Sequence, residues 1–306
     1  MNKLTKYGLT ALAGSLVATS VSAGELGVSG GWSWSYDSSD SDESGQPMSM
    51  GDSVTFSGSG ETDQGWTASV KYELDGGTYD DYSLTLDMGD SGKLVFSGAS
   101  VTPGGIHMVN DIVPAADTPV YSMTDSATAY GIARGADAGG NLSYTISMGD
   151  IAASAEMQKG AGTDRTYGIK YTGIENLTLV AGQGDINPGT VAGETQEKTY
   201  GASYAMGGVT IAYQVTDVDY PGANGADEDS THVGASFAVN DDVTVSYATQ
   251  KTDITGKGED ETNSGFGISY SMGSMSVAAY AGKTENGNGA PTADDEGKGL
   301  TLSIAF

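Results

Sequence analysis

Hydrophobic residues recur at every second position along most of the chain. Between residues 66 and 74, for example, Val70, Tyr72 and Leu74 alternate with Lys71 and Glu73. A period of two is typical of β-strands whose two faces meet different surroundings, because successive side chains point to opposite sides of the sheet. No stripe with helical spacing interrupts this pattern after residue 24. The pattern therefore predicts an all-β fold.

The alternating segments predict sixteen strands, an even number that single-chain bacterial membrane barrels require. The predicted strands span 26–36, 52–59, 66–74, 82–88, 93–98, 141–147, 151–159, 164–172, 177–184, 197–205, 209–216, 230–239, 243–250, 262–271, 275–282 and 297–306. Most have the length that a tilted strand needs to cross a bilayer. Residues 127–133 resemble a weak seventeenth strand, but counting it would move the turn at Met148 to the other rim.

The connections between these strands alternate in length. Short connections are expected at 60–65, 88–93, 148–150, 173–176, 206–208, 240–242 and 272–274. Longer and more acidic connections are expected at 37–51, 75–81, 185–195, 217–229, 252–261 and 284–296. A transmembrane barrel has short turns on one rim and long loops on the other, whereas a soluble sandwich has no reason to alternate in this way. The sequence therefore predicts a transmembrane antiparallel β-barrel.

The composition supports a barrel with a water-filled interior over a packed soluble domain. Hydrophobic residues make up only 38% of the chain, which contains 47 glycines and no cysteine. The missing cysteines exclude disulfides and thiolate metal sites. The 40 acidic residues outnumber the 13 basic ones, which argues against nucleic acid and anionic surfaces as partners.

The first 23 residues have the features of a secretory signal peptide. Lys3 and Lys6 precede a short apolar run, and Val21-Ser22-Ala23 fits a cleavage site. We expect residues 1–23 to be removed between Ala23 and Gly24, which leaves the barrel as residues 24–306. The loss of both lysines leaves 11 of the 13 basic residues against 40 acidic ones, a formal charge of −29.

Taken together, these features resemble general bacterial outer-membrane porins of the alphaproteobacterial type. The resemblance rests on the leader, the alternating strands, the final Phe306, one oversized third loop and the block 140–156, GNLSYTISMGDIAASAE. It implies a water-filled channel in the cell outer membrane for passive diffusion of ions and small hydrophilic solutes. It also implies a homotrimer in contact with outer-membrane lipid, and a role for Phe306 in outer-membrane assembly.

In this family the third loop folds into the lumen and narrows it. The corresponding segment here is about 99–140, which contains three prolines and several apolar residues that favour an ordered loop over a disordered one. The resemblance places the acidic side of the pore constriction at Asp111, Asp117 and Asp125. Arg134, late in the same loop, is a candidate for the basic side.

The strand periodicity adds four further candidates for the constriction. Lys71, Glu73, Glu156 and Lys170 fall on the inward parity of their strands. Family porins place an arginine cluster opposite the acidic loop, but Arg165 falls on the outward parity here. With the strong acidic excess, this pattern predicts a preference for cations.

Aromatic residues are expected mainly on the outward face, as a girdle at the membrane interface. The residues assigned to this girdle are Trp32, Trp34, Tyr72, Tyr82 and Tyr280. A sugar-specific channel would instead need aromatic residues along the lumen.

Other functions find less support in the sequence. A non-channel surface or adhesion barrel, with long acidic loops that bind partners, would need large side chains to plug the lumen, but the inward positions are rich in Ser, Thr, Gly and Ala. An enzyme is not expected, because His107 and His232 are the only histidines and neither lies in a nucleophile motif. No cofactor is expected, although carboxylates gather in one acidic loop that could attract Ca²⁺. These are Asp37, Asp40, Asp42 and Glu43.

Overall fold

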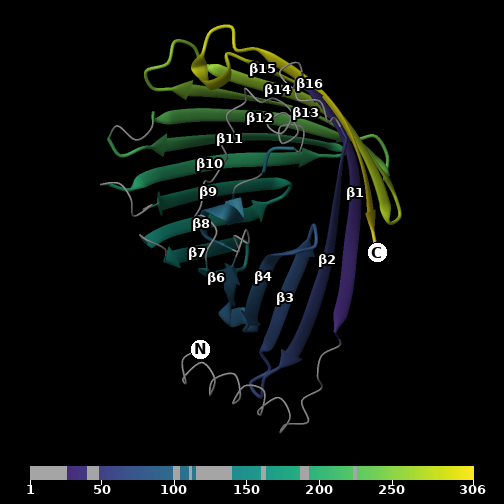
Figure 1. Cartoon of the computed structure of the whole chain (residues 1–306). Helices are drawn as coiled ribbons and strands as arrows, with labels where there is room; N and C mark the ends of the chain where they lie inside the picture. Colours follow the sequence, from purple (N-terminus) through teal and green to yellow (C-terminus); the bar gives the residue numbers. More distant parts are fainter. Residues whose placement is uncertain are drawn as a thin grey trace.

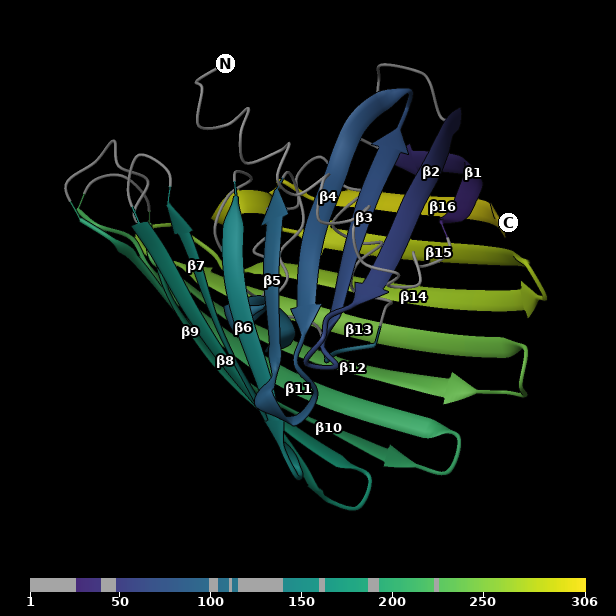
Figure 2. The ribbon, with the colours of Figure 1, turned by 90° about the horizontal axis from the view of Figure 1, so that it is seen from below.

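The chain folds into one closed antiparallel β-barrel. The computed structural model describes residues 26–39, 48–98, 104–109, 112–114, 140–159, 163–186, 193–222 and 226–306. Within these ranges each strand pairs with its neighbours in the sequence, and β1 pairs with β16 to close the wall (Figures 1 and 2). The strands are β1 Gly27–Ser39, β2 Met48–Glu61, β3 Thr67–Asp75, β4 Thr78–Asp87, β5 Lys93–Gly98, β6 Asn141–Met148, β7 Ile151–Lys159, β8 Thr163–Ile174, β9 Leu177–Ile186, β10 Thr195–Met206, β11 Val209–Asp219, β12 Glu228–Ala238, β13 Val243–Ile254, β14 Glu261–Met272, β15 Met275–Glu285 and β16 Asp295–Ala305.

The sixteen predicted strands are all confirmed, and several extend further towards the long-loop rim. β2 starts at Met48 where the sequence predicted residue 52, and β13 ends at Ile254 where it predicted residue 250. The β13 extension carries the polar residues Lys251, Thr252 and Asp253, which weaken the hydrophobic alternation without affecting the backbone ladder. The β2 extension is short and keeps Met48 and Met50 in alternation with Ser49. Residues 127–133, the possible seventeenth strand, lie outside the described residues.

One predicted long connection is wrong. The segment 75–81 was expected to be a polar loop, but β3 ends at Asp75 and β4 begins at Thr78. Gly76 and Gly77 alone form the turn, with φ angles of 54° and 76°. A two-residue hairpin turn of type I′ requires positive φ at both positions, which glycine adopts without a steric penalty.

The two faces of the wall differ sharply in composition. Large apolar side chains on the outward parity are exposed, among them Ile211 and Tyr213. The inward parity carries mostly Ser, Thr, Gly and charged residues. No helix in the described ranges is long and apolar enough to cross a membrane. A wall that is apolar outside and polar inside is the arrangement that suits a barrel surrounded by lipid and filled with water.

Short 3₁₀ helices complete the described structure: η1 Gly89–Ser91, η2 Gly105–Val109 and η3 Gly287–Gly289. Of these, η2 belongs to the long connection between β5 and β6. It lies within the curve of the barrel against β7, β8 and β9 (Figure 1).

Candidate functional site

The start of η2 is hydrogen-bonded to the inner face of β7 and β8. Three successive backbone N–H groups donate to inward side chains: Gly104 to Glu156 Oε2 at 2.8 Å, Gly105 to Ser154 Oγ at 2.9 Å, and Ile106 to Thr166 Oγ1 at 3.1 Å. The first N–H groups of a helix have no partner within the helix, so side chains of the wall satisfy them here. We call the described loop residues 104–109 and 112–114 the loop anchor.

Apolar contacts fix the rest of the loop anchor to the wall. Ile106 and Val109, which are 0% and 1% exposed, pack on Val180 of β9. Further along, Val113 packs on Ala212 and Ala248 of β11 and β13. These contacts include most of the few fully buried apolar residues of the described structure. The hydrophobic core of this protein is therefore the seam between loop and wall.

The last residue of η2 is held by a hydrogen bond from the wall. The amide of Gln214 on β11 donates from Nε2 to the carbonyl oxygen of Val109 at 3.0 Å and to Thr199 Oγ1 at 2.8 Å. Gln214 is 0% exposed. Because a buried carbonyl without a partner is costly, this side chain stabilises the position where the loop leaves the helix.

Glycines on the wall let the loop backbone approach closely. A Cβ at Gly168 of β8 would collide with the carbonyl oxygen of Gly105. Gly105 itself has a φ of 60°, and a Cβ there would collide with Thr166 Oγ1. Both glycines are therefore required where the two backbones meet.

His107 lies in the middle of η2 and is partly buried. Burial lowers its pKa below the ordinary value of 6.5, because the imidazolium loses hydration. Its Nε2 is buried without a hydrogen-bond partner among the described residues. Burial at the centre of the loop anchor therefore favours the neutral imidazole.

The inner wall is covered on one side and open on the other. On β10 to β14, inward polar residues such as Glu197, Gln214, Gln250 and Asn263 are at most 2% exposed. On β1 to β4, none of the inward residues in the described ranges is buried. The accessible part of the lumen therefore runs along β1 to β4.

Carboxylates outnumber lysines on this open wall and the adjoining start of β5. Glu73, Asp75 and Asp87 face inward with Lys71 and Lys93, as the strand register shows. Lys71 Nζ lies 2.7 Å from Glu73 Oε2, and Lys93 Nζ lies 3.3 Å from Asp87 Oδ2. The lysine side chains are 48% and 50% exposed, so these pairs are solvated and hold their charges in contact with water.

The excess acid lies beside a polar hollow of about 410 Å³ in the wall. Its lining includes Ser33, Ser53, Glu73, Asp75, Ser276 and Ser303, from β1, β2, β3, β15 and β16. Asp80, in the adjacent hairpin, is within electrostatic range of Asp75 and Glu73. The combination of hydroxyls and carboxylates suits hydrated cations and small polar solutes.

The structure places the predicted site residues as follows. Lys71, Glu73, Glu156 and Lys170 face the interior, where Lys71 pairs with Glu73 and Glu156 binds the loop anchor. The register puts Lys170 on β8, between Ala152 and Val180 and away from the Lys71–Glu73 pair in sequence and sheet order. The predicted residues of the loop and of the signal cleavage site lie outside the described residues. They are Asp111, Asp117, Asp125, Arg134, Ala23 and Gly24.

Phe306 completes the barrel seam through its backbone. Its N–H donates to the Gly30 carbonyl at 3.0 Å, and its carbonyl accepts from the Gly30 N–H at 2.9 Å. Its side chain is 68% exposed. The last residue thus extends the pairing of β1 with β16.

One residue that was predicted for the outward aromatic girdle faces the interior instead. Tyr280 was predicted to face outward, but its hydroxyl donates to Asp37 Oδ1 and its ring lies beside Gly299 on the inner face. Tyr280 was assigned to the girdle as an aromatic residue, but it lies on the parity opposite Met275 and Val277 and shares its face with the buried Thr284. The lumen therefore contains one aromatic residue near the β1–β16 seam.

The acidic loop that could attract Ca²⁺ lies mostly outside the described residues. Within the described part of the chain, no group of three or more Asp, Glu, His or Cys side chains could hold a metal ion. Asp37 is described and binds Tyr280, whereas Asp40, Asp42 and Glu43 lie outside the described residues.

Sequence reasoning missed the side chains that hold the loop. Ser154, Thr166 and Gln214 are ordinary inward polar residues in a pattern that contains dozens of them. Their role depends on which inward positions meet the loop, and only the three-dimensional register determines that. The run of small residues opposite the loop, such as Gly168, was the one available signal.

Comparisons with known proteins agree with this architecture. A family model described as Gram-negative porin matches residues 8–290. No curated protein is similar enough to count as a match.

Solved structures show the same fold at low sequence identity. The loop L8 deletion mutant of OmpT from Vibrio cholerae is 15% identical with a TM-score of 0.71, and the match covers 93% of this chain and 100% of that one. An anion-selective porin from Comamonas acidovorans is 15% identical with a TM-score of 0.67, covering 92% and 99%. A mutant of the Rh. blastica porin is 14% identical with a TM-score of 0.66, covering 92% and 100%.

Proposed function

The chain belongs to the Gram-negative porin family, and we propose that its channel prefers cations. It is a general diffusion porin of the outer membrane and has no enzymatic activity. Passive diffusion requires a hydrated passage with a charged wall, and no catalytic group. The fold supplies such a passage, because the inner face of β1 to β4 is polar and accessible.

The observation that carries the cation preference is the acidic excess on the open wall. Glu73, Asp75 and Asp87 exceed the two lysines there, and the hollow at Glu73 and Asp75 borders the accessible lumen. A low-dielectric wall focuses the field of such charges and raises the local concentration of counter-ions. The Comamonas porin, which is anion-selective, shows that this fold does not by itself fix the sign.

We further propose that the loop of residues 99–140 narrows this passage. The loop anchor supports this, since it binds the inner face of β7 to β13 and leaves the opposite wall open. In this proposal Asp111, Asp117, Asp125 and Arg134 present their charges towards the lumen. Ions and small hydrophilic solutes then pass between the loop and the strands β1 to β4.

A homotrimer is the assembly that we propose. OmpT of Vibrio cholerae, with the same fold at 14% identity, has been solved in a trimer form. Cross-linking of the protein in outer-membrane vesicles would give a three-subunit band if the proposal holds. A ladder that stops at the monomer would contradict it.

The cation preference is tested in a planar bilayer. The refolded protein is reconstituted, and single-channel current is recorded across a tenfold KCl gradient. Ohmic steps with a reversal potential of the sign set by K⁺ would support the proposal. A reversal potential of the opposite sign would overturn the cation preference, and a folded, heat-modifiable barrel without conductance would overturn the open channel itself.

A further inference from the structure

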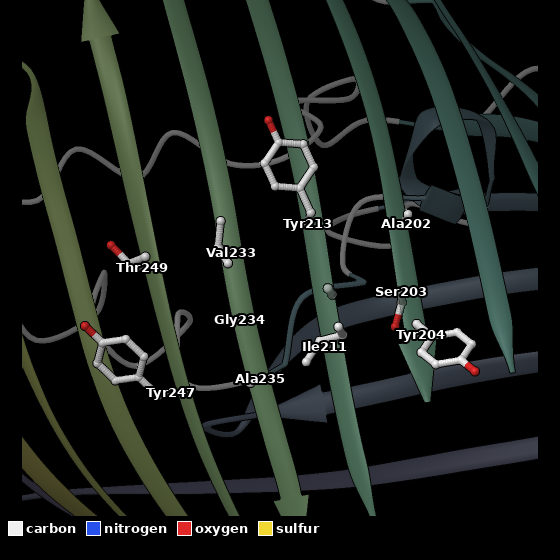
Figure 3. Close-up of a pocket in the computed structure, with 11 residues that line it drawn as sticks. Ala202, Ser203, Tyr204, Ile211, Tyr213, Val233, Gly234, Ala235, Tyr247 and Thr249 are labelled. Atoms are coloured by element: carbon white, nitrogen blue, oxygen red, sulfur yellow. The ribbon is translucent and has the colours of Figure 1, made fainter. Parts of the chain in front are cut away.

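The outward face of β10 to β13 contains a hollow at mid-strand. Its volume is about 490 Å³, within the roughly 300–1,000 Å³ of small-molecule sites. The residues that line it include Ala202, Tyr204, Ile211, Tyr213, Val233 and Tyr247 (Figure 3). Their register places all six on the outward parity, the face that carries the exposed apolar belt.

Small residues make this hollow. Ala202 and Ala235 stand where neighbouring outward positions carry large side chains, and the floor between them is the backbone at Ala212 and Gly234. On the inner side of the same floor, Val113 of the loop anchor packs on Ala212, and a Cβ at Gly234 would meet Val113 Cγ1 at 2.6 Å. The wall is therefore thinnest at the point where the loop is fixed to it.

The rim of the hollow excludes a flat partner. Ile211, Tyr213 and Tyr247 are 53%, 50% and 53% exposed, so they project around the hollow (Figure 3). The backbone of a second barrel would rest on these side chains, so it could fill the space beneath only where one of its own side chains met the gap. An empty apolar space forfeits the dispersion contacts of its lining. A thin flexible chain can pass between the rim residues and fill it.

The chemistry of the hollow selects an apolar occupant. No charged side chain lines it. The nearest outward charge on β13 is Lys251, two residues beyond Thr249 towards the long-loop rim, where it pairs with Asp260. The hollow is thus continuous with the lipid-facing belt of the membrane barrel, below the level at which outward charges begin.

We propose that this hollow binds one acyl chain of a membrane lipid. The chain lies against Ala202 and Ala235 and is flanked by Tyr213 and Tyr247, with its polar end towards Lys251. It packs on the outer side of the segment of wall that holds Val113 inside. This site goes beyond solute diffusion, since it faces lipid and contributes nothing to the lumen.

The test fills the hollow and counts bound lipid. The double variant Ala202→Phe/Ala235→Phe is compared with wild type in proteoliposomes that contain a phospholipid with a spin label near the end of its acyl chain. The matched control is Ala279→Phe/Ala281→Phe on β15, which adds the same bulk to another outward stretch. We expect the filled variant to lose one motionally restricted lipid per subunit, and the control to lose none. Equal counts in wild type and both variants would overturn the proposal.

A second measurement does not depend on the folding of the filled variant. The chain has no cysteine, so Ala235→Cys gives a single site for a fluorescent label. Lipids with brominated acyl chains should quench this label more strongly than one at Ala279→Cys. A label that is protected from quenching would show that a neighbouring subunit covers the hollow, and would overturn the acyl-chain site. Single-channel conductance is recorded for every variant. If the conductance is unchanged, a negative result in either lipid experiment overturns the acyl-chain site alone and leaves the proposed channel standing.

Discussion

Removal of the Ile106 side chain should release the loop anchor without unfolding the barrel. Ile106 is 0% exposed, and it packs on Val109 and Val180 while its N–H donates to Thr166. Ile106→Ala keeps that hydrogen bond but leaves a cavity between η2 and β9. None of the ladder hydrogen bonds between strands involves this residue, so the lost energy falls on the loop alone.

The size of the effect follows from known core truncations. An Ile→Ala change at a fully buried site costs about 2–5 kcal/mol. Since 1.4 kcal/mol corresponds to a tenfold change in an equilibrium constant, the undocked population of the loop should rise roughly 30-fold to several thousand-fold. A lower value within this range is expected if Met108 and Ile112, which pack on the same cluster, move into the space.

Hydrogen exchange measures this population directly. Exchange of the amides of Gly104, Gly105 and Ile106 in the folded protein requires their bonds to the wall to open. Ile106→Ala should accelerate their exchange by the factor above, and single-channel records should show added current fluctuations. Leu84→Ala, on the outer face and 45% exposed, is the control for loss of a similar side chain and should leave these amides unchanged. Unchanged exchange in Ile106→Ala, with the barrel folded, would refute the role assigned to this seam.

Three further predictions concern charge, pH and assembly. Glu73→Gln with Asp75→Asn should shift the reversal potential in a KCl gradient towards zero, and an unshifted potential would place the selectivity elsewhere. Burial lowers the pKa of His107 in the docked loop, so the undocked loop binds the proton more strongly. Docking should therefore weaken as the pH falls from the ordinary histidine pKa of 6.5 to the lowered pKa of the docked state. Hydrogen exchange at several pH values should show this acid sensitivity, and His107→Gln should remove it. Deletion of Phe306 removes two backbone hydrogen bonds to Gly30, each worth about 0.5–1.5 kcal/mol, and should lower the yield of heat-modifiable barrel in the outer membrane.

The strands could be predicted from the sequence because their faces differ in polarity. Residues such as Val70 and Lys71 alternate so regularly that strand number, order and face follow from period two. The signal fails where the outward residues are no longer apolar. In the extension of β13 to Ile254, the outward residues Lys251 and Asp253 are charged, so no hydrophobic alternation marks the strand, although Thr252 and Ile254 are buried. At 75–81 the acidic residues suggested a loop, although Gly76-Gly77 is itself a hairpin signal.

The site could be predicted only in part. The alternation along each strand correctly predicted an inward position for four residues, because the facing of a side chain depends only on its own strand. These are Lys71, Glu73, Glu156 and Lys170. The alternation could not separate the open wall from the covered wall, because this difference depends on a loop that crosses from β5 to β13. Glu156 shows the limit: an inward carboxylate predicted for the constriction accepts a hydrogen bond from Gly104 and is 3% exposed.

The position of the loop is set by small residues that the register aligns across strands. Ala212, Gly234, Ala248 and Gly265 are successive cross-strand neighbours on the inner face of β11 to β14. In the sequence they are single small residues about 14 to 22 positions apart, and they form a row only when the sheet is paired. A slip of one residue in any of these pairs would turn one member to the lipid face and place a larger side chain under Val113. The glycine content that marked this chain as unusual thus has a local cause: small residues inside receive the loop anchor, and the same thin wall leaves the hollow outside that an acyl chain can fill.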